Sequence, residues 1–155
     1  MVKALTLWAP HGVLIPFRWK EVETRDWYTA YRGPLAIHVA KIFTPEHAAE
    51  CARMATITSR ICVGDPLRHA WQASIQPMLG CVVATCTLAA CLPTSFAVES
   101  AKKLKPPFTP ELSWEVEWEM GNYAAGRWAW ILRDVKPFYQ PVPARGHQKL
   151  WEWEL

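Results

Sequence analysis

The sequence predicts an α+β fold in which a small, strongly bent sheet or barrel of five or six strands carries helices packed at its side. Two observations predict it: β-rich runs recur from the first residues to the last, and helical patterns interrupt them. With 155 residues, the chain is long enough to bury one sizeable core. We therefore expect a single domain that spans residues 1–155.

The expected strands are recognised by β-branched and aromatic residues between turn signals. In the last of them, Trp151, Trp153 and Leu155 alternate with Glu152 and Glu154, which is the period of a half-buried strand. The longest run, in the middle of the chain, is expected to be the central strand. The strands are expected at residues 3–8, 32–41, 79–92, 127–135 and 149–155.

Two helices are expected between the second and the third of these strands. Thr44 is a suitable N-cap and Pro45 follows it at the first helical position, so a helix should begin there and continue through EHAAECARMA. After a Gly-Asp-Pro loop, a shorter helix is expected at residues 66–75. A further helical stretch should follow Pro10, and Pro16 should bend it or keep it short.

Composition and the N-terminus argue against a membrane protein. The longest apolar run, residues 80–93, is interrupted by Thr85 and Thr87 and is shorter than the ~20 residues of a membrane-spanning helix. The N-terminal segment has one lysine and an apolar stretch broken by Pro10, which is not the pattern of a secretory signal peptide. We expect a cytoplasmic protein without a membrane partner.

The five cysteines are odd in number and scattered, without a CxxC pair. Disulfide frameworks and thiolate zinc sites place cysteines closer together, so these are expected to be reduced core residues. No metal ion or cofactor is implied. The net charge of +3 and the isoelectric point near 8.6 permit contact with nucleic acid but are less basic than in a dedicated nucleic-acid-binding domain.

Charge is concentrated at residues 18–27, RWKEVETRDW, where six charged side chains stand with two tryptophans and a single aliphatic residue. In a strand or extended turn, Glu23 and Arg25 share a face, and Lys20 can reach Glu23 across a turn. Either these three residues form an ion-pair network that closes the fold, or they line a wet functional pocket.

Five segments in order along the chain resemble a known family: ALTLWAPHGVLI at 4–15, the K-x-x-E-x-R element of Lys20, Glu23 and Arg25, YRGPLAIHVAK at 31–41, GCVVATCTL at 80–88 and EWEMGNYAAGRWAWIL at 117–132. On these segments the chain resembles the ASCH family, a branch of the PUA-like superfamily, over most of its length. K-x-x-E-x-R is the signature of that family, and Arg18 stands where its members commonly have glycine. The resemblance implies a small PUA-like β-barrel of five to six strands.

The resemblance also implies a pocket for a nucleobase, a nucleoside or an RNA segment. Some members are described as RNA-binding or RNA-cleaving, and some small bacterial members as amidohydrolases of N(4)-acetylcytidine. For this chain we expect a hydrolase that removes an acyl group from the exocyclic amine of a modified pyrimidine nucleoside, giving cytidine and a carboxylic acid. The alternative is an RNA-binding module or a ribonuclease that uses the same basic cleft.

Hydrolysis of such an amide needs a base that activates water, a donor to the oxyanion and an acid for the leaving nitrogen. The residues expected to supply these groups are Lys20, Glu23, Arg25 and Glu117. In the favoured hypothesis Glu23 or Glu117 activates water while Lys20 and Arg25 stabilise the oxyanion, and the reverse assignment with Lys20 as base stays open. The amidohydrolase members have threonine at the position of Glu23, and Thr24 of this chain faces the opposite way along an extended strand.

Further residues are expected to bind the substrate. The pattern E-x-x-x-G-x-Y-x-x-G-R, shared with the family, contains Tyr123, which would stack on or hydrogen-bond to a base. The same pattern contains Arg127, which would enter the pocket or brace the loop. Lys41 ends a predicted strand, where its cation would meet the pocket or cap the strand in solvent.

Tryptophans are the other candidates for base binding, because aromatic faces stack on bases. Trp8, Trp19 and Trp27 flank the charged stretch and are the best placed, and Trp27 is the favoured member. Tryptophans in the last two strands are expected to pack in the core or the barrel wall.

The charge pattern favours a nucleoside substrate over an RNA strand. The net charge is modest, and acidic residues near the expected pocket would repel phosphates: Glu111, Glu115, Glu117 and Glu119. A basic, proline-broken segment at residues 102–110 is expected to be mobile and would hold RNA under the alternative. The sequence does not indicate an oligomeric state.

Overall fold

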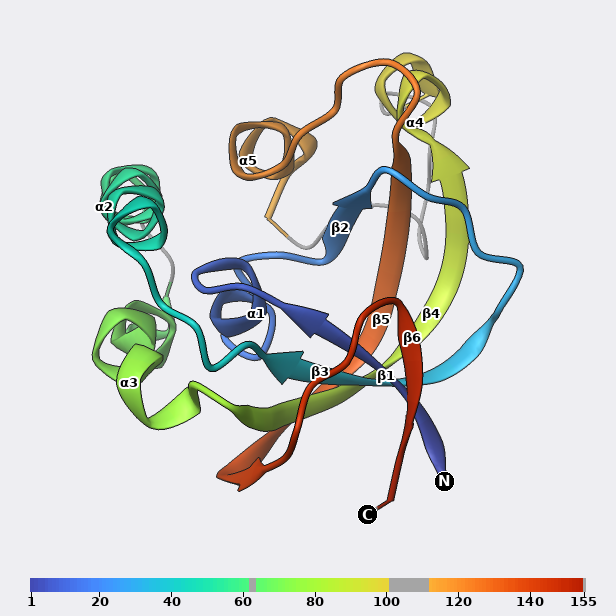
Figure 1. Cartoon of the computed structure of the whole chain (residues 1–155). Helices are drawn as coiled ribbons and strands as arrows, with labels where there is room; N and C mark the ends of the chain where they lie inside the picture. The colour runs from blue at the N-terminus through green and yellow to red at the C-terminus, as the bar shows by residue number, and fades with distance from the viewer. Residues whose placement is uncertain (62–63, 101–111, 155) are drawn as a thin grey trace.

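The computed structural model of the chain describes residues 1–61, 64–100 and 112–154. Six strands form one mixed sheet in the order β2-β5-β4-β3-β1-β6, with helices beside it (Figure 1), so the predicted α+β class is confirmed. The strands are β1 (Val2–Leu7), β2 (Val22–Arg25), β3 (Gly33–Val39), β4 (Cys81–Pro93), β5 (Trp128–Pro143) and β6 (Leu150–Trp153). The helices are α1 (His11–Leu14), α2 (Pro45–Ser59), η1 (Pro66–Ser74), α3 (Ile75–Met78), α4 (Thr94–Ser100) and α5 (Trp114–Met120).

The sheet is antiparallel except between β1 and β3, which run parallel. The long strands β4 and β5 curve strongly (Figure 1), and their pairing contains three register shifts, between Val82 and Ala84, Thr85 and Thr87, and Leu88 and Ala90. Such irregularities bend a strand and increase its twist. The strand order is open, because β2 pairs with β5 and β6 pairs with β1 but the two do not pair with each other. As far as the described residues show, the sheet is therefore strongly bent but not closed into a barrel.

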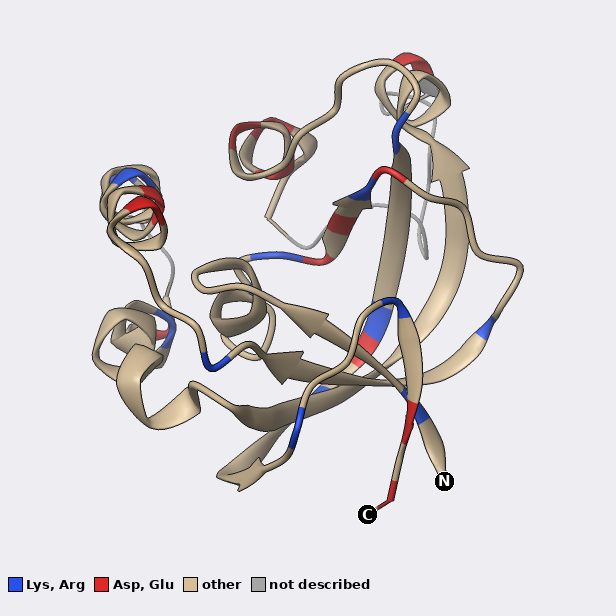
Figure 2. Cartoon of the chain, viewed as in Figure 1, with Lys and Arg blue, Asp and Glu red and all other residues tan. Residues whose placement is uncertain are grey.

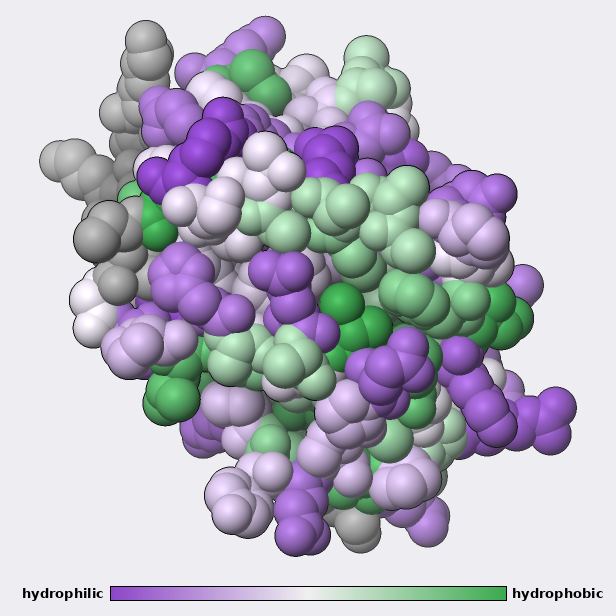
Figure 3. Space-filling view, turned by 90° about the vertical axis from the view of Figure 1, so that its left-hand side faces the viewer, coloured by the Kyte–Doolittle hydropathy of each residue, from purple (hydrophilic) through white to green (hydrophobic). Residues whose placement is uncertain are grey.

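The main core lies where α1, α2, η1 and α3 gather on one side of the sheet (Figure 1). Leu5, Ile37, Leu88 and Trp130 contribute from four strands and are fully buried there. A second apolar cluster lies where α4 and α5 approach β2, β4 and β5, and a third, which includes Trp153, holds the other face of the sheet near the chain ends. On the outer face that carries α2 and η1, hydrophilic and hydrophobic side chains are interspersed (Figure 3).

Several predicted elements are confirmed. The strands expected at 3–8, 32–41, 79–92, 127–135 and 149–155 correspond to β1, β3, β4, β5 and β6, and the charged stretch contains the short strand β2. Thr44 caps α2 as predicted: its hydroxyl accepts from the His47 amide (3.3 Å), and the His47 ring accepts from the Thr44 amide (3.0 Å). The helix after Pro10 is a single short turn, α1.

Other elements differ from the prediction. The segment 66–75 forms a 3-10 helix followed by α3 rather than one α-helix, and α4 and α5 were not predicted. β5 continues to Pro143, about twice the predicted length, even though it contains three prolines. Beyond Ile131, β5 pairs with β4 but no longer with β2. A proline has no backbone N–H to donate, and it is tolerated here because the side of β5 that faced β2 has no strand that needs such a donor.

The cysteines that the structure describes are unbonded and buried, as expected of reduced core residues: Cys51, Cys81, Cys86 and Cys91. Cys62 and the basic segment at residues 102–110 lie outside the described residues. Within the described part of the chain, no helix is both long and apolar enough to cross a membrane.

Candidate functional site

The turn before β2 brings the charged stretch against the core. Trp19 is buried, its amide donates to Leu14 O (3.1 Å), and its indole N–H donates to the Arg68 carbonyl. Arg18 just before it has φ of 60°, the left-handed conformation that glycine adopts most readily. Because Trp19 is anchored in this way, the next residue, Lys20, is carried into the interior and is 1% exposed. The prediction that Trp19 stacks on a ligand is therefore wrong.

Lys20, Glu23 and Arg25 converge as the sequence predicted. Lys20 Nζ lies 3.2 Å from Glu23 Oε2, and Arg25 Nη1 lies 3.7 Å from Glu23 Oε1. Lys20 Nζ also donates to Val22 O (2.9 Å). An ammonium has three donors, and among the described residues no acceptor takes the third N–H of Lys20. One cationic donor thus stays available at this point.

The electrostatics of the cluster keep Glu23 ionised. Burial alone would raise the pKa of its carboxyl, but Lys20, His11 and Arg25 outweigh that effect and the pKa is lowered. His11 in α1 is lowered to a pKa of about 4, mainly because it is buried and also because Lys20 lies nearby. At neutral pH the cluster therefore contains the neutral imidazole of His11 and the ionised carboxylate of Glu23, which lies next to the cations of Lys20 and Arg25.

A cavity of about 230 Å³ opens onto this cluster. β2 supplies Glu23, Thr24 and Arg25, and the other walls come from the helices α1 and α2 and from the connection between α5 and β5. The residues that line it are His11, Lys20, Glu23, Thr24, Arg25, Glu50, Arg53, Met120, Gly121, Asn122 and Arg127. Charged and polar groups predominate, which suits a reacting centre better than a site for an apolar ligand.

A second cavity, of about 530 Å³, adjoins the first and shares His11, Glu23 and Arg25 with it. We call it the aromatic cavity. Its walls include Trp8, which follows β1, and Trp27, which follows β2. The Trp27 ring packs edge-on against Trp130, with centroids 4.7 Å apart, and Lys149 Nζ lies 5.9 Å from the Trp27 centroid. Trp8 is 61% exposed. Two of the three predicted tryptophans therefore flank a space beside the charged cluster.

Glu117 does not reach either cavity. Its Oε1 accepts from the Glu21 amide (2.6 Å), and among the described residues its Oε2 has no hydrogen-bond partner. Burial raises the pKa of its carboxyl to about 7, although Lys20 and the Glu21 amide act in the opposite direction. Glu117 therefore lines neither cavity, whereas Glu23 lines both and Glu50 lines the smaller one.

Arg127 lines the small cavity but also braces the connection between α5 and β5. Its Nε donates to Asn122 O and its Nη2 to Thr24 O, both at 3.1 Å. The backbone amide of Asn122 in turn donates to the Thr24 hydroxyl (3.1 Å). Thr24 is thereby placed in the cavity wall, contrary to the expectation that it faces away from the site, and its hydroxyl is engaged with the loop.

Two residues expected to bind the substrate lie elsewhere. Tyr123 lines neither cavity, since its ring packs against the second apolar cluster, and burial raises the pKa of its hydroxyl. Gly121 makes room for that ring, because a Cβ at this glycine would lie 2.6 Å from Tyr123 Cε2. Lys41 is exposed and lines a different cavity beyond Trp8.

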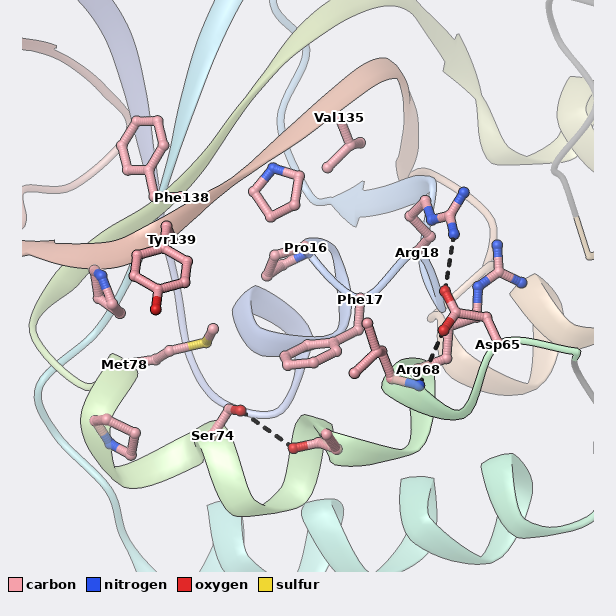
Figure 4. A pocket seen from close by; sticks show the side chains of 15 residues that line it. Pro16, Phe17, Arg18, Asp65, Arg68, Ser74, Met78, Val135, Phe138 and Tyr139 are labelled. Atoms are coloured by element: carbon pink, nitrogen blue, oxygen red, sulfur yellow. Dashed lines mark hydrogen bonds and ion pairs between the residues drawn. The ribbon is translucent and has the colours of Figure 1, made fainter.

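The most apolar of the large cavities, about 820 Å³, lies away from this cluster. Figure 4 shows Phe17, Met78 and Phe138 around it, with the Arg18–Asp65 ion pair at one end. None of Lys20, Glu23 and Arg25 lines it. We place the candidate site at the charged cluster because polar groups able to perform chemistry converge there, whereas the lining of the other cavity is mainly apolar.

Sequence reasoning missed the residues that helices bring to the site. His11 lines both cavities, and Glu50 and Arg53 reach the smaller one from α2. His11 Nε2 lies 3.8 Å from Glu50 Oε1, and Glu50 accepts from Arg53 Nε (3.0 Å) and Nη2 (2.6 Å). The sequence signal that could have pointed to this part of the site was His11, the titratable residue directly after Pro10. The part of the chain that the structure describes holds no group of three or more His, Cys, Asp or Glu side chains suited to a metal ion.

No protein-family model matches the chain, and a search of curated proteins finds no significant match.

Proposed function

We propose that this protein is a hydrolase that removes an acyl group from the exocyclic amine of a modified pyrimidine nucleoside such as N(4)-acetylcytidine. The observation that carries the proposal is the meeting of Lys20, Glu23 and Arg25 at a small polar cavity that continues into a larger one flanked by Trp8 and Trp27. The larger cavity has room for a flat heterocycle beside aromatic rings, and the smaller one has charged groups for an amide.

In the proposed complex the pyrimidine lies beside Trp8 and Trp27 and its acyl amide points toward Glu23. Glu23 takes a proton from a water molecule as the water oxygen bonds to the acyl carbon, and the carbonyl oxygen becomes an oxyanion. Lys20 and Arg25 donate to that oxyanion. The C–N bond then breaks, the proton passes from Glu23 to the leaving nitrogen, and the products are cytidine and a carboxylic acid, which releases its proton to solvent.

The roles of lysine and carboxylate follow from their contacts. Lys20 has an unused N–H at the cavity, while Glu23 has a lowered pKa and lines both cavities. An ammonium is a donor and not a base, so this arrangement supports Lys20 as the oxyanion donor. Glu117 takes no direct part because it is buried away from both cavities.

Membership of the ASCH family and a PUA-like barrel are part of the same proposal. The three residues of the K-x-x-E-x-R element meet at one cavity, and Arg18, which stands where family members commonly have glycine, has a left-handed φ of 60° that glycine adopts most readily. β2 and β6 are the two edge strands of the sheet. Trp27, just after β2, and Lys149, just before β6, both line the aromatic cavity, and Lys149 Nζ lies 5.9 Å from the Trp27 centroid. These side-chain contacts between the two edges support a barrel that is closed by side chains rather than by backbone pairing.

The experiment is to follow cytidine release from N(4)-acetylcytidine by absorbance. We expect turnover by the wild type and a loss of about 10²–10³-fold in Lys20→Ala and in Glu23→Gln, because each lacks one group that acts in the transition state. Lys136→Ala, which removes an exposed lysine of β5, should keep wild-type turnover. Circular dichroism of each variant confirms that it is folded. No release by folded wild-type protein with substrate in excess would refute this activity, and assays of RNA binding and cleavage would then test the alternative.

A further inference from the structure

A third cavity, of about 950 Å³, extends the candidate site away from the charged cluster. It shares five lining residues with the aromatic cavity: Thr6, Trp8, Ile42, His147 and Gln148. The aromatic cavity in turn shares His11, Glu23 and Arg25 with the smallest one. The three cavities therefore adjoin one another in a row from Lys20 past Trp8 to Lys41 and Arg145, and we call this row the groove.

The far end of this groove is cationic. Lys41 and Arg145 line it, and the described residues that border this cavity include no aspartate or glutamate. Neither side chain has a hydrogen bond or ion pair with another described residue. The loop between β5 and β6, residues 144–149, carries basic and no acidic residues (Figure 2). Two cations thus face a cavity without a carboxylate to neutralise them.

The backbone is closely packed near both residues, although their side chains are exposed. Gly80 has φ of +74°, a conformation that favours glycine, and it lies against the Lys41 stem, since a Cβ there would be 3.4 Å from Lys41 Cβ. Beside Gly80, whose carbonyl accepts from the Ala144 backbone amide (3.0 Å), the His38 ring donates from Nε2 to Ala144 O (3.0 Å). A Cβ at Gly146 would lie only 2.5 Å from His38 Cε1, so the loop sits closely on that buried ring. Arg145 lies between these two contact points.

We propose that the far end of the groove is a phosphate subsite, and that the substrate is bound as a nucleotide whose phosphate lies between Lys41 and Arg145. This inference rests on the proposed function, because the pyrimidine occupies the adjoining aromatic cavity. A neutral nucleoside has no group that needs two unpaired cations, whereas a phosphate accepts charge-assisted hydrogen bonds from both lysine and arginine. The phosphate is either a terminal one or an internal one of an oligonucleotide.

The test measures binding separately from catalysis. Tryptophan fluorescence titrations of the wild-type protein compare cytidine, cytidine 5′-monophosphate and a short oligocytidylate, none of which carries an acyl amide for the proposed hydrolase to cleave. We expect a phosphorylated ligand to bind about 10-fold or more tightly than cytidine at low salt. That preference should fall to near unity in Lys41→Ala/Arg145→Ala and stay unchanged in Lys136→Ala. An increase in affinity with the monophosphate indicates a terminal phosphate, and an increase with the oligonucleotide alone indicates an internal one.

Equal affinity for all three ligands, no measurable binding of any of them by folded protein, or a phosphate preference that survives in the double variant would overturn the subsite. Its failure is distinguishable from failure of the proposed function. A protein that prefers the nucleotide but releases no cytidine from acetylated substrate retains the subsite and loses the hydrolase. A protein that deacylates the nucleoside and binds all three ligands alike retains the hydrolase and loses the subsite.

Discussion

Lys20 and Glu23 are buried together, and their charges are compensated chiefly by each other. Removing an ion from water costs several kcal/mol, which a close partner and further hydrogen bonds only partly offset. Arg25 and the Val22 carbonyl add such contacts, but Arg25 is partly exposed and lies at 3.7 Å. A buried pair of this kind is weak support for stability, which is consistent with the role that we propose for it at the cavity.

At the residue scale we predict strong coupling between these two charges. Lys20→Met leaves Glu23 buried with a weaker partner and should lower the free energy of unfolding by about 3 kcal/mol. The double variant Lys20→Met/Glu23→Leu removes both charges and should be more stable than the sum of the two single changes predicts. Urea unfolding of the four proteins measures this cycle. Additive losses would show that the pair is not coupled.

At the scale of elements, β2 is a four-residue edge strand, and its position depends on what braces it. One side pairs with β5. Beyond that pairing, Arg127 and the Asn122 amide tie Thr24 to the connection between α5 and β5. These contacts hold the strand that carries Glu23 and Arg25 against the loop that forms the opposite wall of the cavity.

We predict that Arg127→Lys loses this bracing, because an ammonium does not reproduce the planar fork that reaches two carbonyls. Loss of two hydrogen bonds should lower the free energy of unfolding by about 1–2 kcal/mol and increase hydrogen exchange at the Asn122 amide. Arg60→Lys is the matched control, since Arg60 makes an exposed contact with Glu119 and its change should cost less than about 0.5 kcal/mol. Equal costs for the two substitutions would contradict a bracing role.

At the scale of the whole molecule, Glu117 joins α5 to the turn that enters β2 through its bond from the Glu21 amide. Its pKa of about 7 lies above the ordinary 4.5, so the folded protein binds this proton more tightly than the unfolded chain. The contribution to stability is complete below about pH 4.5 and is lost as the pH rises to about 7. Ionising this carboxyl therefore works against the fold.

Glu117→Gln should abolish the loss of stability between about pH 4.5 and 7, because the new side chain does not ionise. The oxygen of the glutamine side chain can still accept from the Glu21 backbone amide. The unfolding free energy of the variant relative to wild type should increase by about 3 kcal/mol between pH 4.5 and 8, which is the equivalent of the difference between a pKa of about 7 and 4.5. Urea unfolding across this pH range measures it. Glu115→Gln changes an exposed carboxylate of the same helix and should show no such trend. A constant difference for Glu117→Gln would show that its carboxyl titrates normally.

The elements that could be predicted are those whose signals are local. Thr44 and Pro45 mark the start of α2 by their own chemistry, and the apolar run after Gly80 forms β4. The second half of β5 could not be predicted, because prolines disfavour a strand unless one of its sides lacks a partner. That condition depends on where β2 ends, which is not encoded near the prolines.

By itself, the sequence determined the α+β class, most of the strands and the convergence of Lys20, Glu23 and Arg25, since all of these depend on residue type and short spacings. Only the tertiary structure decided which of the other charged and aromatic residues accompany them. It buried Glu117 beneath the turn, placed Lys41 at the far end of the groove and brought His11 into both cavities. The physical reason is that burial and long-range contact depend on how distant segments pack, whereas periodicity and capping act within a few residues.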